Sequence, residues 1–132
     1  MLIGFDLKKD PKQILAAYND RKGITKKFNL NLLKRINREL DADFQVDAFD
    51  HFPSYNSVSG SCRSYLISLK EQSVQIGNEL IRFSQFEPIY MELSQKYSVY
   101  QVDALSTETG FKPVAYYYDS KRWFLDALWE KM

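Results

Sequence analysis

The sequence has few of the residues that build disulfides, metal centres and membrane spans. Of its 132 residues one is a cysteine, Cys62, and one is a histidine, His51. A single cysteine excludes an internal disulfide, and with a single histidine it excludes a Cys/His zinc site. No apolar run approaches the roughly 20 residues that span a bilayer, and the apolar N-terminal stretch is too short for a signal peptide. We therefore expect a cytoplasmic protein with no membrane partner and no metal.

Groups that carry catalytic chemistry are also scarce. There is no glycine-rich phosphate loop. His51 stands alone beside Asp50 and Phe52, which favours a structural or exposed histidine over a catalytic one. Cys62 has no neighbouring base that would activate it as a nucleophile. The residues alone predict no complete catalytic site and no catalytic residue.

Charge is unevenly spread along the chain. Residues 1–40 carry ten Lys/Arg and four Asp/Glu, whereas residues 41–132 carry eight and thirteen. The basic residues of the first part alternate with apolar ones at helical spacing, which is typical of a solvated helix face. The alternative is an interaction domain whose basic helices contact nucleic acid or an acidic partner. We expect no nucleic-acid partner.

Local signals predict a pair of helices near the N-terminus, after a short buried strand over 2–5. Asp10 and Pro11 are a helix start, so we expect a helix over 11–19. Gly23 ends that segment and Thr25 is expected to cap a second helix. That second helix should bury one apolar stripe, which consists of Phe28, Leu32, Leu33, Ile36 and Leu40.

The remaining chain predicts strands with one more helix. Short alternating segments separated by turns at 56–61 and 77–78 indicate an antiparallel meander. Ser98 and Gln101 form a capping box that opens a helix, which Gly110 closes. Strands over 112–118 and 123–129 then form a hairpin. The expected fold class is α+β: a helical pair, an antiparallel β-meander, then a helix and a C-terminal β-hairpin in a single domain over 1–132.

Several motifs together resemble the histidine-specific methyltransferase family. The stretch from Gly4 to His51 contains D-L-x-K-D-P, A-Y-N-D, G-x-T, F-N-x-N-x-L, N-R-E-L and A-D-F-x-x-D-x-F-x-H, in that family's order and spacing. Ile89 to Ser98 is similar to the family's I-x-x-E-x-S-x-K-Y segment. The family's enzymes use S-adenosylmethionine to trimethylate the α-amino nitrogen of histidine on the ergothioneine pathway. The final helix and hairpin resemble the end of class I methyltransferases generally.

The resemblance implies a division of labour within a larger enzyme. In such enzymes the Gly-rich loop and acidic residue that hold S-adenosylmethionine lie upstream of the segment that matches this chain. We therefore expect this chain to be the substrate-recognising C-terminal part, with no cofactor-binding residue and no binding of S-adenosylmethionine by itself. Its expected partners are a histidine-like amino acid and the cofactor-binding domain of the same enzyme. Self-association through an apolar face, exposed where that domain would pack, is also expected.

Three residues match the family's substrate-binding positions. Tyr18 matches the tyrosine of A-Y-N-D, which binds the substrate's carboxylate end; the alternative is a tyrosine packed on the sheet. Glu92 and Ser94 match E-x-S, which reads the imidazole ring. A strand over 89–97 would place both on one face, with Ile89, Met91 and Leu93 on the other, whereas a helix would not. The alternative for Glu92 is plain exposure to solvent.

One position departs from the family pattern. Where histidine-specific members read roughly I-E-M, this chain has Arg63-Ser64-Tyr65, and Ser64 takes the place of an apolar methionine lining the pocket. A smaller, polar side chain leaves room or offers a hydrogen bond, so a related amino acid stands beside histidine as the predicted substrate. The alternative function is a non-catalytic amino-acid-binding module.

Overall fold

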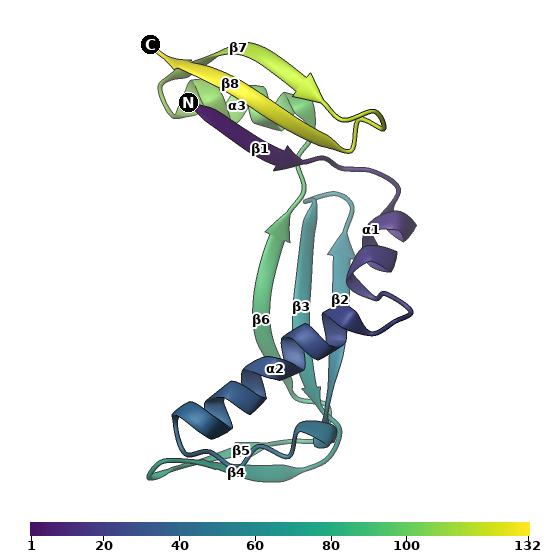
Figure 1. The fold of residues 1–132 in the computed structure, drawn as a ribbon, viewed down its shortest axis with the longest axis vertical. Helices are drawn as coiled ribbons and strands as arrows, with labels where there is room; N and C mark the ends of the chain where they lie inside the picture. Colours follow the sequence, from purple (N-terminus) through teal and green to yellow (C-terminus); the bar gives the residue numbers. More distant parts are fainter. The chain divides into compact units, whose positions relative to one another are not determined.

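The computed structural model describes residues 1–132 and shows an α+β chain, as predicted (Figure 1). Three α-helices and eight strands follow one another with one short 3-10 helix, η1 (Val46–Ala48). Contacts divide the chain into two compact units. Unit 1 comprises residues 1–14, 55–62 and 94–132, and unit 2 comprises residues 15–54 and 63–93.

Unit 1 is built on a three-stranded sheet. β1 (Leu2–Asp6), β8 (Phe124–Lys131) and β7 (Phe111–Tyr118) pair in the order β1-β8-β7, with both pairs antiparallel. Helix α3 (Val99–Glu108) adds Val102 to the core of this unit. The core comprises Phe5, Leu7, Val102, Leu125, Ala127 and Trp129.

Unit 2 contains helix α2 (Ile24–Glu39) and the hairpin of β4 (Gln72–Ile76) and β5 (Glu79–Phe83). Its core comprises Leu33, Phe44, Phe49, Leu66, Val74 and Phe83. A second sheet has the order β2-β3-β6, formed by β2 (Phe49–Asn56), β3 (Ser61–Ser68) and β6 (Pro88–Gln95). Helix α1 (Pro11–Tyr18) precedes α2. The order of helices and strands along the chain therefore matches the sequence prediction.

The start of α2 differs from the prediction. Thr25 does not cap the helix; Gly23 is the N-cap residue, in a left-handed conformation with φ of 66°. The Asp20 carboxylate accepts hydrogen bonds from the backbone N–H groups of Ile24 and Thr25, each at 2.9 Å. A carboxylate satisfies the helix's first donors better than the Thr25 hydroxyl does, because its charge opposes the positive end of the helix dipole.

The buried stripe of α2 is also narrower than predicted. Leu33 is buried and Ile36 packs on the core, but Phe28 is 74% exposed and Leu32 and Leu40 are also exposed. Asn29 takes the place next to Leu33 in the interior. Its side-chain amide donates to the backbone oxygen of Thr25 at 3.0 Å, which satisfies the buried amide.

The predicted meander is divided between two sheets. Ser68, at the end of β3, exchanges backbone hydrogen bonds with Phe86 and Glu87 just before β6. β6 therefore pairs with β3, while residues 72–83 form their own two-stranded hairpin.

Candidate functional site

Glu92 and Ser94 lie two residues apart on β6, so of the two conformations left open for this segment the structure has the strand. Ile89 and Met91 pack against the core of unit 2. Strand alternation turns the side chains of Glu92 and Ser94 to the other face. Glu92 is exposed and Ser94 is half-buried. Both side chains are therefore open to a ligand, as a recognition role requires.

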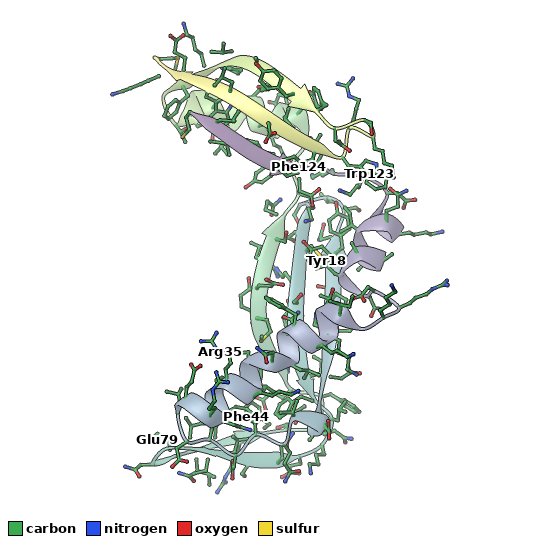
Figure 2. All side chains as sticks on the ribbon, viewed as in Figure 1. Tyr18, Arg35, Phe44, Glu79, Trp123 and Phe124 are labelled. Atoms are coloured by element: carbon green, nitrogen blue, oxygen red, sulfur yellow. The ribbon has the colours of Figure 1, made fainter.

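Glu92 borders a groove of about 240 Å³ in unit 2. Met91 and Glu92 come from β6, and the other lining residues come from α2: Phe28, Asn29, Asn31, Leu32 and Arg35. Arg35 is held by Glu39 one turn further along the helix, with a separation of 3.2 Å between nitrogen and oxygen. Figure 2 labels Arg35 on α2 and Tyr18 on α1. The groove thus combines an apolar lining with a carboxylate and amide groups.

Ser64 lies in the interior of unit 2, paired with His51. Ser64 is 1% exposed, and its Oγ lies 3.2 Å from His51 Nε2. Burial lowers the pKa of His51, against the opposing charges of Asp50 and Glu92. The imidazole is therefore neutral at pH 7, with one nitrogen available for the Ser64 hydroxyl. The structure gives the hydroxyl a partner within the protein, which the sequence did not indicate.

Tyr18 is the last residue of α1 and is half-buried. The same helix borders a cavity of about 450 Å³, through Leu15, Ala16 and the following Asn19. The opposite wall is β2, from Asp50 to Pro53. Tyr18 itself does not line this cavity. Tyr18 ends the helix and directly precedes Asn19, which lines the cavity.

Ser94 belongs to unit 1, where it contacts a buried lysine. The Nζ of Lys96 donates to Ser94 Oγ at 2.8 Å and lies 2.7 Å from Asp6 Oδ2. Lys9 contacts the other carboxylate oxygen of Asp6 at 2.6 Å. Burial raises the pKa of the Asp6 carboxyl, but the hydrogen bonds from Lys9 and Lys96 outweigh it and hold the pKa below its usual value. Asp6 is therefore a carboxylate that neutralises a buried ammonium group.

Sequence reasoning missed Asp6 and Lys96. Both lie within segments that resemble the family, D-L-x-K-D-P and E-x-S-x-K-Y, yet neither was given a role. A lysine directly after an apolar strand was the available signal, because lysine is almost never fully buried unless it is paired.

Neither a metal-binding cluster nor a membrane-spanning helix is found in the chain. No group of three or more His, Cys, Asp or Glu side chains gathers closely enough to hold a metal ion. None of the helices has the length and apolar character needed to cross a bilayer.

Comparison with known proteins identifies relatives along nearly the whole chain. The model of the family "Histidine-specific methyltransferase, SAM-dependent" matches residues 1–131. The histidine N-alpha-methyltransferase of Mycobacterium tuberculosis is 36% identical over 121 residues, which are 90% of this chain and 38% of that protein. The enzyme of the same name from Mycolicibacterium smegmatis is 34% identical with the same coverage. Ergothioneine biosynthesis protein 1 of Neurospora crassa is 31% identical over 87% of this chain and 13% of its own length.

The chain thus spans about two fifths of the length of its mycobacterial relatives. The match nonetheless runs through both compact units and includes the segments that carry Tyr18, Ser64, Glu92 and Ser94. The chain belongs to the histidine-specific, S-adenosylmethionine-dependent methyltransferase family, which confirms the resemblance read from its motifs.

Proposed function

We propose that this chain is the substrate-recognition part of an S-adenosylmethionine-dependent methyltransferase that acts on the α-amino group of histidine or a related amino acid. The observation that supports this best is the pair Glu92 and Ser94, two residues apart on β6 and both accessible, in a chain of this family. A carboxylate accepts a hydrogen bond and a hydroxyl can donate one, which matches the two nitrogens of a neutral imidazole.

The remaining predicted residues have roles that follow from their chemistry. The Tyr18 phenol donates a hydrogen bond to the substrate carboxylate. Ser64 sets the size of the ring pocket in place of a methionine. The residues described contain no glycine-rich turn between a strand and a helix, so we assign none of them to the cofactor. We propose that residues 1–132 correspond to the C-terminal part of the enzyme, with β7 and β8 as the closing strand pair of a class I methyltransferase.

In this proposal the chain contributes positioning rather than covalent chemistry. S-adenosylmethionine, when bound, supplies an electrophilic methyl group on sulfur. Glu92, Ser94 and Tyr18 hold the amino acid by its two ends, so that the lone pair of the α-amino nitrogen points in one direction. Held in this way, the lone pair would be directed at the methyl group that the bound cofactor would supply. Fixing the approach of the nitrogen lowers the barrier by reducing the entropy lost in the reaction.

Isothermal titration of this chain with histidine tests the proposal. Glu92→Gln keeps the shape of the side chain and an accepting oxygen but removes the charge. We expect about 5- to 10-fold weaker binding, because a hydrogen bond to a charged group, worth about 1.5–3 kcal/mol, becomes a neutral one worth about 0.5–1.5 kcal/mol. Glu79→Gln is a matched control, because Glu79 is also exposed and belongs to the same unit. Tyr18→Phe removes only the phenol oxygen and should weaken histidine without affecting histidinol, which lacks the carboxylate.

Two results would contradict the proposal. One is an absence of histidine binding by the folded wild-type chain. The other is equal affinity in wild type, Glu92→Gln and Glu79→Gln.

Self-association through an exposed apolar face stays a proposal. The exposed side chains of Ile24 and Phe28 on α2 are its candidates. Gel filtration with light scattering should show a dimer that Phe28→Ser disrupts, and a clean monomer at high concentration would contradict it.

A further inference from the structure

Lys96 is a buried charge that the proposed recognition chemistry does not use. Its side chain is 2% exposed, and it is among the largest fully buried side chains of the chain. Moving an ammonium group out of water costs several kcal/mol, and an apolar pair of similar volume often stabilises a fold as well. Stability alone is therefore a weak reason for a lysine at this position.

The backbone around Lys96 is held on both sides within unit 1. Its N–H donates to the Gly60 carbonyl at 2.8 Å, and the next N–H, of Tyr97, donates to the Asp6 carbonyl at 3.0 Å. The Asp6 carboxylate then fixes the end of the side chain, with Oδ2 at 2.7 Å from Nζ. The ammonium group consequently has a defined place relative to Ser94 Oγ, 2.8 Å away.

The contact with Lys96 favours donation by Ser94 to a ligand, because it uses one of the two lone pairs of the hydroxyl oxygen. An ammonium group only donates hydrogen bonds, so in this contact the Ser94 oxygen is the acceptor. A lone serine hydroxyl donates or accepts as its surroundings require, but here one lone pair is occupied and the O–H proton must point away from Lys96. Ser94 is half-buried, and Lys96 is the partner that the structure gives its hydroxyl. The hydroxyl is thereby prepared to donate.

We infer that Lys96, held by Asp6, is a positioning residue that makes Ser94 a hydrogen-bond donor, so that the site takes a ring with an unprotonated nitrogen. The inference rests on the proposed function. It adds a specificity that Ser94 lacks by itself: a hydroxyl that is set to donate needs a ring nitrogen with a free lone pair, and a neutral imidazole offers one. An imidazolium ring, with two N–H groups, would face the Ser94 proton and the ammonium group behind it.

A double-mutant cycle, with histidine binding measured by titration, separates positioning from a merely structural role. Ser94→Ala should weaken binding about fivefold, as for the loss of one net hydrogen bond. Lys96→Met should weaken it by a similar factor, and the double variant by no more than either single one. Lys9→Met is the control, because it removes the other ammonium group from Asp6 without touching Ser94; we expect unchanged affinity.

A second measurement compares two histidine analogues and leaves Lys96 unchanged, so it remains possible if Lys96→Met fails to fold. Thiazolylalanine offers a ring nitrogen acceptor without an N–H, and pyrrolylalanine offers an N–H without an acceptor. Ser94→Ala should weaken the first ligand and leave the second unchanged. The inference is overturned if Ser94→Ala weakens the second ligand equally, or if the two single effects multiply in the double variant. An absence of histidine binding by the folded wild type would instead contradict the proposed function itself.

Discussion

Replacing Gly60 by alanine should lower the free energy of unfolding of unit 1 for two separate reasons, the backbone conformation and the lack of space for a side chain. The φ of Gly60 is +79°, where a side chain costs about 1–2 kcal/mol. In addition, a Cβ atom there would lie 2.2 Å from the backbone oxygen of Lys96 and 2.7 Å from Lys8 Cε. The lysine tip can move, but the Lys96 backbone is hydrogen-bonded to Gly60 itself and cannot. Overpacking of this kind adds about 1–3 kcal/mol.

Gly110 provides a control in the same unit. Its φ of +80° matches that of Gly60, but a Cβ atom there would meet nothing within 4 Å. Gly110→Ala should therefore lose only the conformational part, about 1–2 kcal/mol, and Gly60→Ala about 2–5 kcal/mol. Both tryptophans, Trp123 and Trp129, lie in unit 1, so their fluorescence follows this unit during urea unfolding.

With a urea m-value of about 1–3 kcal/mol/M, the midpoint of Gly60→Ala should fall about 1 M below that of Gly110→Ala. Equal midpoints for the two variants would refute the reasoning, because they would show that the approach to the Lys96 carbonyl has no energetic weight.

Two further predictions concern helix starts. Ser98→Ala removes a complete capping box from α3, in which Ser98 Oγ accepts from the Gln101 N–H and Gln101 Oε1 accepts from the Ser98 N–H. Unfolding followed by tryptophan fluorescence should show that the free energy of unfolding falls by about 1 kcal/mol. Ser120→Ala, in an exposed turn, should leave it unchanged. Backbone hydrogen bonds from Thr25 and Ile24 lower the pKa of Asp20 from 3.8 to about 2, so its contribution to stability is present above pH 4 and lost as the pH falls through 2. Urea unfolding followed by far-ultraviolet circular dichroism should find Asp20→Ala less stable than wild type at pH 7, and the gap should shrink to a small part of that difference at pH 2. A gap as large at pH 2 as at pH 7 would contradict this origin.

Features that depend on a few neighbouring residues could be predicted from the sequence. The Ser98 capping box and the proline at the start of α1 are examples, because each is decided within one helical turn. Thr25 shows the limit of that approach. Asp20 lies five residues earlier in the chain, and the left-handed Gly23 brings its carboxylate to the same backbone groups.

Features that depend on distant pairing could not be predicted. Nothing local shows that β1 pairs with β8, or that residues 72–83 leave the main sheet as a hairpin. The same holds for the proposed site. Glu92 and Ser94 could be proposed from the sequence because their spacing and the family motif lie in one segment, whereas Lys96 looks like an ordinary surface lysine until Asp6, ninety residues earlier, is placed beside it.

The pairing of β1 with β8 also sets an order of events while the chain is being synthesised. Unit 2 comprises residues 15–54 and 63–93, so its contacts can form before residues 94–132 are made. β1 pairs with β8, so until β8 has been made the core that Phe5 and Leu7 share with Leu125 is incomplete. While β1 lacks β8, its unpaired backbone N–H and C=O groups can pair with another chain. Loss of β8 by truncation should therefore yield an aggregating protein rather than a shorter folded one.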